Sequence, residues 1–495
     1  MNNPPVQSLS SRYGERYRWL LLFSVMVGVM ASIMSSTIVN VAIPGMSHHF
    51  ALGQERAQWV SSGFMVAMTV SMLTTPWLLS RYGYRRTYIG TMVLLLVGGL
   101  MGGLANNFSL VLIARVAEGL AAGVVQPIPA IIILRAFEPH EQGRASGIFG
   151  MGVVLAPAIG PSIGGVLVDL FGWRSIFFMV VPFCLSSIWL AFKFVPTTAP
   201  GGVVAARSGG LDWRGLTLGT VGTLCLLNGL VELRGDSPWQ AVALLAAAAI
   251  AFAAFIAWQK RLATTGGLPL MNLALFKYRQ FAMGSVVAFI YGTALFGSTY
   301  LLPVYMQVGL HLSASHVGTI LLPAGIVLAL TIAGVGRLAD KHPTYLLVCT
   351  GLGLLAASFA LMMVLRIDSA LWLLVVFAIV GRVGLGFILP SLNLGSMRPL
   401  AKPLIPQGAS AINFLRMLGG AAGVSLCAIV LEWRLAAHGD SLANVATSPA
   451  RIAAFDEVFA MLAALCALAI CAAWQLREKA PNNRDAPPSI NLDPN

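Results

Sequence analysis

The sequence predicts an all-α membrane protein with 14 transmembrane helices, arranged as two six-helix bundles plus a two-helix insert. Two observations on composition indicate this class: 57% of the 495 residues are hydrophobic and only 10% are charged. The third is that apolar stretches of about 20 residues, long enough to cross the hydrocarbon core of a bilayer, recur along the whole chain. The protein is therefore expected to reside in lipid.

The apolar stretches define the predicted helices in order. Their starts lie near Trp19, Ala57, Tyr88, Ser109, Ser146, Ser175, Gly215, Trp239, Phe281, Ser315, Tyr345, Ala370, Gly408 and Ala453. An even number of spans places both termini on the same side of the membrane.

An internal repeat organises these stretches into halves. The segment WLLSRYGYRR (77–86) is echoed 260 residues later by RLADKH (337–342), and GVVQP (123–127) is echoed 263 residues later by GFILP (386–390). The starts of the first and ninth apolar stretches are 262 residues apart. Parallel repeats of this kind place a substrate cavity between two bundles, and rocking of the bundles gives alternating access.

The repeat also predicts the domain organisation. The expected segments are a cytoplasmic N-terminus (1–18), an N-terminal six-helix bundle (19–195), a cytoplasmic loop (196–214), two inserted transmembrane helices (215–259), a second cytoplasmic loop (260–280), a C-terminal six-helix bundle (281–475) and a disordered cytoplasmic tail (476–495).

The charge distribution predicts the orientation. With the N-terminus in the cytoplasm, 22 Lys and Arg residues fall in cytoplasmic segments and only six in outer loops. Because positive residues are retained on the cytoplasmic side, this asymmetry predicts that both termini are cytoplasmic. The net charge of +13 then reflects topology, and we find no basic helix or aromatic-basic motif that would indicate nucleic-acid binding.

The fifth apolar stretch contains the run LAPAIGPSIGG. Gly160, Gly164 and Gly165 remove side chains, so that another helix can approach closely. Pro157 and Pro161 remove backbone donors and bend a helix. The run predicts a packing and bending device within the membrane.

Glu118 is the one acidic residue at predicted membrane depth, and Arg115 lies on the same helical face three residues earlier. In one interpretation, protonation of Glu118 releases Arg115 and changes the balance of inward-facing and outward-facing states. In the other, a permanently ionised pair ties helices together. Intramembrane ionisable residues are usually functional, whereas an adjacent arginine opposes titration, so both interpretations stay open. For Arg416 a tie between helices is favoured over substrate contact.

Six motifs carry a family resemblance over nearly the whole chain: STIVNVAIP (36–44), QWV (58–60), RVAEG (115–119), the run at 155–165, YLLPVYMQ (300–307) and NFLRMLGG (413–420). Together they resemble the fourteen-span drug:proton antiporter branch (EmrB/QacA type) of the major facilitator superfamily. The resemblance implies the major facilitator fold and a secondary active multidrug efflux transporter that exchanges lipophilic or cationic compounds for protons by alternating access. The run at 155–165 resembles the antiporter motif of that branch.

Several positions depart from the family pattern. Ser35 stands where the family usually has an Asp, one of its candidate proton carriers, and Glu118 stands where it usually has Gln. The resemblance therefore suggests that the carboxylate has moved from the first span to the fourth. The missing Asp also makes a proton-independent facilitator or uptake carrier a credible alternative. Pro76 and Ser80 replace a Gly and an Asp of the first gating loop, whereas the second loop keeps both residues.

The resemblance also assigns candidate site residues. Arg115 and Glu118 are the candidates for proton coupling. The candidates for the substrate cavity are Asn40, Trp59, Phe64, Tyr291, Tyr300, Gln307, Asn393, Asn413 and Arg416, and those for the gating loops are Arg81, Gly83, Arg85, Gly336, Asp340 and Lys341. A carboxylate such as Asp340, near a helix N-terminus, is stabilised by the helix dipole and can pair with a basic residue on the next helix, which would hold the cytoplasmic side shut in one state. The alternative is a charged loop that only sets the topology.

We expect no enzyme activity, because the sequence contains no phosphate-binding loop, HEXXH motif or nucleophile elbow. No cofactor and no metal site are predicted, since His48 and His49 have no further ligands nearby in sequence. The expected partners are small lipophilic substrates, protons and membrane lipid. The resemblance implies a multi-pass protein of a bacterial inner (plasma) membrane. In double-membrane bacteria, the resemblance implies a periplasmic adaptor and an outer-membrane channel as possible partners. No residue of this sequence requires either of them.

Overall fold

The structure is a computed structural model of the chain, and it describes residues 11–52, 54–200, 209–233, 238–366, 369–440 and 448–477. Within the helices, the side chains at 54–55, 58, 157–159, 161–162 and 314–315 also lie outside the description. The described part of the chain is helical, with short connections.

The N-terminal half of the chain forms seven described helices. They are α2 (Arg16–His49), α3 (Gln54–Ser71), α4 (Thr75–Gly103), α5 (Phe108–Val125), α6 (Ile128–Ala136), α7 (Gln142–Phe171) and α8 (Ser175–Phe194). A short 3-10 helix, η1 (Met72–Thr74), joins α3 to α4.

The rest of the described chain begins with two helices, α9 (Trp213–Glu232) and α10 (Pro238–Thr264). Six long helices follow: α11 (Arg279–Val304), α12 (Ala314–Leu338), α13 (Thr344–Met362), α14 (Leu371–Met397), α15 (Ile405–Ala437) and α16 (Pro449–Trp474). Three short helical segments connect them, namely η2 (Leu273–Lys277), η3 (Tyr305–Gly309) and η4 (Lys402–Leu404).

The prediction of 14 transmembrane helices is wrong. Among the described residues, 12 helical segments are long and apolar enough to cross a membrane. The sequence predicts separate spans starting near Ala57 and Tyr88, but the stretch between them lies within α4, so Trp59–Gly103 forms a single apolar segment of 45 residues with a break in the helical backbone at Gly83. In addition α7, where the fifth span is predicted and part of which lies outside the described side chains, is not among the 12.

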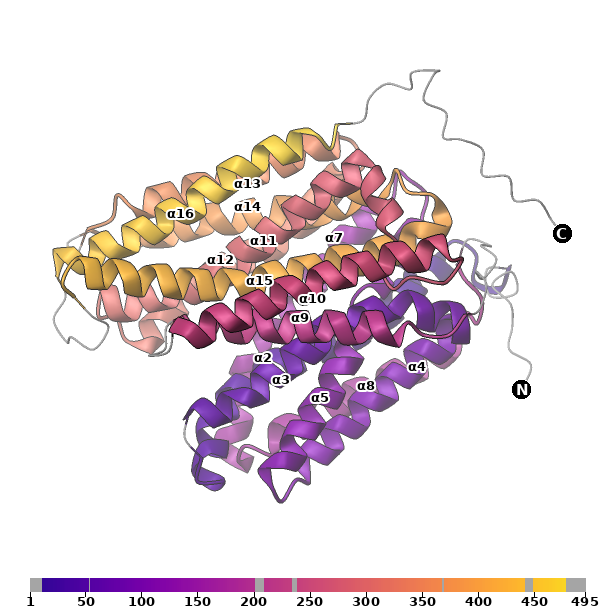
Figure 1. Cartoon of the computed structure of the whole chain (residues 1–495), viewed down its shortest axis with the longest axis horizontal. Coiled ribbons are helices and arrows are strands. Elements are labelled where there is room, and N and C mark those ends of the chain that lie inside the picture. The colour runs from indigo at the N-terminus through magenta and orange to yellow at the C-terminus, as the bar shows by residue number, and fades with distance from the viewer. Residues whose placement is uncertain are drawn as a thin grey trace.

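The helices pack into two groups, one of α2 to α8 and one of α11 to α16. Figure 1 shows that the groups lie close together at the end of the molecule that carries both chain termini and diverge toward the opposite end. Helix α7 of the first group packs along α12 of the second, while α15 contacts α3, α4 and α6. The two groups are therefore joined mainly at one end.

Helices α9 and α10 form a hairpin that lies between the groups (Figure 1). Asp212 caps α9, because its carboxylate accepts a hydrogen bond of 2.8 Å from the backbone N–H of Gly215. The same carboxylate accepts hydrogen bonds from Trp258 Nε1 (2.8 Å) and Gln259 Nε2 (2.7 Å) on α10. One buried acid thus fixes the two helices to each other, and α9 also contacts both α3 and α15.

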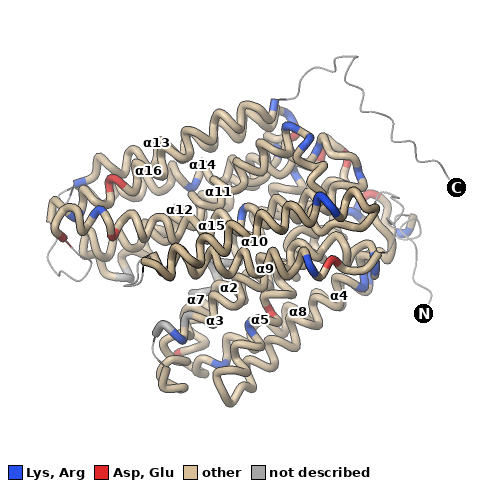
Figure 2. The backbone as a smooth tube through the Cα atoms, in the orientation of Figure 1, with Lys and Arg blue, Asp and Glu red and all other residues tan. Residues whose placement is uncertain are grey.

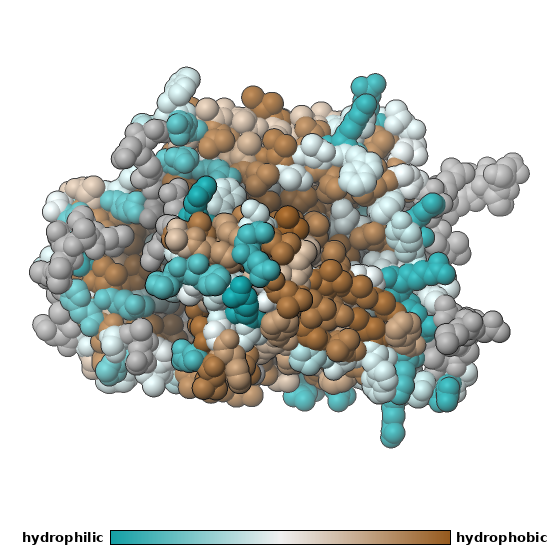
Figure 3. Space-filling view, turned by 90° about the horizontal axis from the view of Figure 1, so that it is seen from below, coloured by the Kyte–Doolittle hydropathy of each residue, from teal (hydrophilic) through white to brown (hydrophobic). Residues whose placement is uncertain are grey.

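The surface agrees with a protein embedded in lipid. Figure 3 shows a broad area of hydrophobic side chains on one face, with hydrophilic side chains beside it near the middle of the view and at the edges. Figure 2 shows many Lys and Arg residues at the end where the chain termini lie. Exposed Trp, Leu and Val side chains are abundant along the helices, as expected where lipid rather than water is the surrounding solvent.

Candidate functional site

A buried ion pair lies at the centre of the N-terminal group. Arg115 and Glu118 are three residues apart on α5, and Arg115 Nη1 lies 2.6 Å from Glu118 Oε2. Their side chains are only 2% and 0% exposed. The predicted pairing of these two residues is therefore present, and both charges are removed from solvent.

The guanidinium of Arg115 joins three helices. Its Nη1 donates to the backbone oxygen (3.2 Å) and the hydroxyl (3.0 Å) of Ser35 on α2. Its Nε donates to the backbone oxygen of Val60 on α3 at 3.2 Å. The guanidinium also lies 4.2 Å from the ring centroid of Phe64, a cation–π contact with a fully buried ring. The packing of α2, α3 and α5 thus depends on one charged side chain.

Glu118 faces α4, where two glycines leave room for it. A Cβ atom at Gly98 would lie 2.7 Å from Glu118 Cγ, and one at Gly99 would lie 3.6 Å from Glu118 Oε1. Oε1 is buried and has no hydrogen-bond partner among the described residues. Burial disfavours the charged form of a carboxyl group, whereas an adjacent arginine favours it, so the two surroundings of Glu118 act in opposite directions.

Ser35, which stands where the resembling family usually has Asp, lies beside the buried pair. A carboxylate at this position on α2 would lie beside the guanidinium of Arg115, which the Ser35 hydroxyl contacts here. Glu118 meets the same guanidinium from α5. The two positions are therefore alternative places from which a carboxylate can reach one arginine, a relation that the sequence does not contain.

The structure brings some predicted cavity residues together and leaves others apart. On α15, Arg416 Nη2 donates to Asn413 Oδ1 at 2.8 Å, and the buried Tyr291 of α11 lies within electrostatic reach of Arg416. Between α2 and α3, Ser61 donates to Asn40 Oδ1 at 2.8 Å.

The other cavity candidates lie elsewhere. Phe64 is buried beneath Arg115, and Gln307 is exposed within η3. Tyr300 on α11 and Asn393 on α14 are half-buried. Trp59 is 45% exposed and lines a lateral cavity of about 740 Å³ between α3, α4, α5 and α9. Sequence reasoning missed this cavity, because four helices from separate parts of the chain form its walls.

Asp340, which follows α12, contacts the N-terminus of α7 in the other group. Its Oδ1 accepts a hydrogen bond from the backbone N–H of Gly143 (2.6 Å), and its Oδ2 accepts one from Arg144 (2.8 Å). The helix dipole favours a carboxylate at this place. Burial nevertheless raises the pKa of Asp340 above its ordinary value, and this effect outweighs the lowering caused by the two backbone hydrogen bonds.

Other contacts close the same end of the molecule. Gly336 on α12 packs against Gly147 on α7 so closely that a Cβ at 336 would lie 2.5 Å from the Cα of Gly147. Arg398 Nη2 donates to the backbone oxygen of Pro139 at 3.0 Å. Arg135 Nη2 donates to the backbone oxygen of Lys402 at 2.8 Å. Lys341 is exposed beside this closed interface.

The first gating-loop candidates have a local role within their own group. Gly83 has a φ of 76°, which side chains other than glycine rarely adopt, and it interrupts the regular backbone of α4. Arg85 Nε then donates to the backbone oxygen of Val195 at 2.6 Å, at the end of α8. Arg81 is exposed. Gly83 and Arg85 thus shape the contact of α4 with the end of α8, whereas Asp340 contacts the other group of helices.

The predicted antiporter motif lies in α7, which runs unbroken from Gln142 to Phe171. Gly160 and Gly164 face α2, where added Cβ atoms would meet Thr37 and Ile38. A Cβ at Gly165 would meet nothing within 4 Å. The side chains of the two remaining motif residues, Pro157 and Pro161, lie outside the description.

Two groups of apolar helices that close at one end and diverge at the other, with an ion pair buried at membrane depth, define a multi-pass membrane transporter. The sequence profile of the Major Facilitator Superfamily matches residues 25–424, and the chain belongs to this superfamily. Its members are transporters, so the protein is not an enzyme. The expected all-helical fold of this superfamily is confirmed, whereas the predicted number of 14 spans is wrong.

Several known proteins are similar to this chain. The "Multidrug resistance protein B homolog" of Mycobacterium tuberculosis (strain ATCC 25618 / H37Rv) is 30% identical over 433 residues, which cover 85% of this chain and 78% of that protein. The "Lincomycin resistance protein LmrB" of Listeria monocytogenes is 26% identical over 429 residues, covering 85% and 88%. The crystal structure of the human organic anion transporter MFSD10 covers 92% of this chain and 99% of its own, with a TM-score of 0.67 and 15% identity, and shows the shared fold.

Proposed function

We propose that the protein is a secondary active exporter that exchanges protons for lipophilic or cationic compounds by alternating access. The observation that carries this proposal is the buried pair of Arg115 and Glu118, with a hydrogen bond from Arg115 to Ser35. Glu118 serves as the proton carrier, in place of the carboxylate that the drug:proton antiporter branch has at the position of Ser35. Intramembrane acids of this kind commonly relay protons.

The contacts of Arg115 suggest how protonation could be coupled to movement. When Glu118 takes up a proton, Arg115 keeps only neutral acceptors on Ser35 and Val60 and the ring of Phe64. A buried cation without a counter-charge is costly, so α2, α3 and α5 shift to give the guanidinium new partners. Because Glu118 is 0% exposed, it exchanges its proton only in a conformation that opens this site.

The interface at Asp340 acts as the gate in this proposal. The many basic residues near the termini (Figure 2) support a cytoplasmic position for that end, since positive residues are retained there. The closed contacts of α7 with α12 then lie on the cytoplasmic side, and the described conformation is outward-facing. We place the protein in a bacterial inner membrane with both termini in the cytoplasm.

The relatives support the proposed substrate class, because one is named for multidrug resistance and another for lincomycin resistance. Asn413 and Arg416, which are joined by a hydrogen bond on α15, are the polar groups that we propose orient the substrate. A periplasmic adaptor and an outer-membrane channel are proposed partners in a double-membrane bacterium.

The test is proton flux into liposomes that contain the purified protein and a pH-sensitive dye, on addition of lipophilic cations and neutral drugs. We expect substrate-triggered flux in the wild type and its loss in Glu118→Gln, because Gln keeps the size of the side chain but carries no proton. The double variant Ser35→Asp with Glu118→Gln should recover flux, since a carboxylate on α2 also reaches Arg115. Gradient-driven export that survives in Glu118→Gln alone would disprove Glu118 as the carrier.

A second candidate function is a proton-independent facilitator. The 2.6 Å contact between Arg115 and Glu118 favours it, because a short buried ion pair can simply tie α5 to its neighbours. Substrate movement down its own gradient, equal in the wild type and in Glu118→Gln and without proton movement in either, would select this function.

A further inference from the structure

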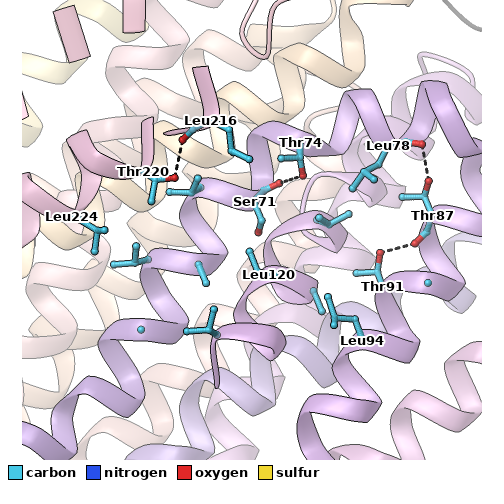
Figure 4. Close-up of a pocket in the computed structure, with 18 of the residues that line it drawn as sticks. Ser71, Thr74, Leu78, Thr87, Thr91, Leu94, Leu120, Leu216, Thr220 and Leu224 are labelled. Carbon is cyan, nitrogen blue, oxygen red and sulfur yellow. Dashed lines mark hydrogen bonds between the residues drawn. The ribbon is translucent and has the colours of Figure 1, made fainter. Parts of the chain in front are cut away.

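The lateral cavity of about 740 Å³ lies on the outer side of the N-terminal helix group. This volume is within the range of sites that hold drug-sized molecules. Helices α3, α4 and α5 form its inner walls, and Leu216, Thr220 and Leu224 of α9 form the outer wall. These three residues are spaced by four and therefore share one face of α9. Figure 4 shows them opposite Thr87, Thr91 and Leu94 of α4.

The walls of the cavity are apolar in effect, although several carry hydroxyl groups. Thr87 donates to the backbone oxygen of Leu78 (2.9 Å), and Thr91 donates to that of Thr87 (2.6 Å). On the other walls, Thr74 donates to Ser71 (2.7 Å) and Thr220 to Leu216 (2.7 Å), and Figure 4 marks these bonds. Because these hydroxyl groups donate their protons to backbone carbonyls, a molecule bound in the cavity would contact mainly carbon atoms.

One charge lies at the edge of this apolar space. Arg86 is the only Lys, Arg, Asp or Glu among the described residues that line the cavity, and it is exposed. It lies on α4 directly after Arg85, which binds the backbone oxygen of Val195 at the end of α8, and this end of α8 contacts Tyr17 near the start of α2. A basic side chain at this level of a membrane protein attracts anionic lipid headgroups.

The length of the cavity also suits a lipid chain. Along α3 and η1 its lining runs from Trp59 to Thr74, which is roughly 22 Å at the rise of a helix. One leaflet of the hydrocarbon core is about 15 Å thick. An acyl chain that starts beside Arg86 therefore fits within the cavity over its whole length.

We propose that this cavity is a binding site for one anionic phospholipid, with its phosphate at Arg86 and an acyl chain between α4 and α9. The charge of Arg86 and the apolar walls together define this ligand chemistry. The lipid would fill the space between the inserted hairpin and the first helix group and couple them mechanically. The inference does not depend on proton coupling or on the identity of the exported compound.

The test is native mass spectrometry of the purified protein titrated with palmitoyl-oleoyl phosphatidylglycerol or with phosphatidylcholine of the same chains. Two variants address the two parts of the site. Gly90→Leu places a side chain in the cavity at a position where an added Cβ meets nothing within 4 Å, and Arg86→Gln removes the charge. Gly353→Leu on α13, which also has open space at its Cβ, and Lys260→Gln on α10 are the matched controls.

We expect the wild type to bind one phosphatidylglycerol at least tenfold more tightly than phosphatidylcholine. Gly90→Leu should weaken that single binding event at least tenfold, and Arg86→Gln should abolish the preference between the two lipids, while both controls behave as the wild type does. Equal lipid binding by all five proteins would overturn the proposal. It would also be overturned if Gly90→Leu kept its lipid but lost binding of tetraphenylphosphonium, because the cavity would then hold the transported compound.

Discussion

At the scale of single residues, Arg115 is the side chain on which most of the site depends. It pairs with Glu118, contacts Ser35 and Val60, and lies over Phe64. Each contact comes from a different turn of α2, α3 or α5. A single buried charge therefore holds the N-terminal helices together and, in the proposed mechanism, also responds to the protonation of Glu118.

Removal of Arg115 alone should be strongly destabilising. We expect Arg115→Met to lower the free energy of unfolding by about 3–5 kcal/mol, because Glu118 is left buried without its counter-charge. The double variant Arg115→Met with Glu118→Met should recover most of this loss, since no isolated charge remains. Denaturant titration in detergent measures both, with the exposed Arg261→Met as control. A double variant as unstable as the single one would contradict this account.

Asp340 should make the closed interface sensitive to pH. Burial raises its pKa above the ordinary value while α7 and α12 are in contact, despite the opposing charges of Arg398 and His140. In the separated state the carboxyl group returns to water and to its ordinary pKa. The closed state therefore binds the proton more readily, so it is favoured as pH falls and loses stability as pH rises through the raised pKa.

The measurement is the distance between labels on α7 and α12, recorded from about pH 7 down to about pH 4, which spans the range above the ordinary pKa of Asp. We expect the short-distance population to grow as the pH falls. In Asp340→Asn the pH dependence should disappear, because the side chain no longer titrates. A short-distance population that shrinks on acidification would show that the carboxylate hydrogen bonds outweigh burial.

The sequence could predict the Arg115–Glu118 pair because both residues lie on one helix, where a spacing of three residues places them on the same face. It could not predict the contact between Arg115 and Ser35, which depends on how α2 packs against α5. Nor could it predict that Asp340 binds backbone amides of α7, since the sequence suggests only a basic residue on the next helix as a partner. The spacing of residues predicts which side chains are neighbours on one helix, whereas it does not predict contacts between separate helices.

At the scale of elements, the α9–α10 hairpin is the part of the molecule that has no counterpart in the internal repeat. The sequence identifies it as two apolar stretches left over between the repeats, and both stretches are helices. Its position against α3 and α15 and the cavity behind α9 follow from side-chain packing across separate helices. The error in the number of spans also arises at this scale, because the segment 77–86, which the sequence indicates as a loop between two spans, is part of α4 and departs from helical geometry at Gly83.

Asp212 should be the residue that stabilises this hairpin most. Asp212→Ala removes the cap of α9 and the acceptor for Trp258 and Gln259. A lost cap costs about 0.5–2 kcal/mol and a lost hydrogen bond to a charged acceptor about 1.5–3 kcal/mol, so we expect a loss of stability of roughly 2–4 kcal/mol. Thermal unfolding measures the loss, and the exposed Asp169→Ala is the control. Equal melting of the two variants would contradict the assigned role.

At the scale of the whole molecule, the two helix groups are joined at the end with the termini and separate toward the other end (Figure 1). The close approach of α7 and α12 through Gly147 and Gly336 makes this joint tight. Major facilitator transporters of known structure share this fold. In the proposed alternating-access cycle, the state of this joint decides from which side the space between the groups is open.

A side chain inserted into the joint should open it. In Gly336→Val the new Cβ would lie 2.5 Å from the Cα of Gly147, so α12 must move away from α7. We expect a longer distance between labels on these helices and a loss of the closed population. Gly334→Val on the same helix, where an added Cβ meets nothing within 4 Å, should leave the distance unchanged. Unchanged distances in both variants would show that the joint tolerates the extra volume.

The contacts of α9 with both α3 and α15 have a consequence for molecules dissolved in the bilayer. The two helix groups meet on two sides: the hairpin lies against α3 and α15 on one side, while α7 packs along α12 on the other. A hydrophobic solute that diffuses in the plane of the membrane therefore meets a different set of helices on each side.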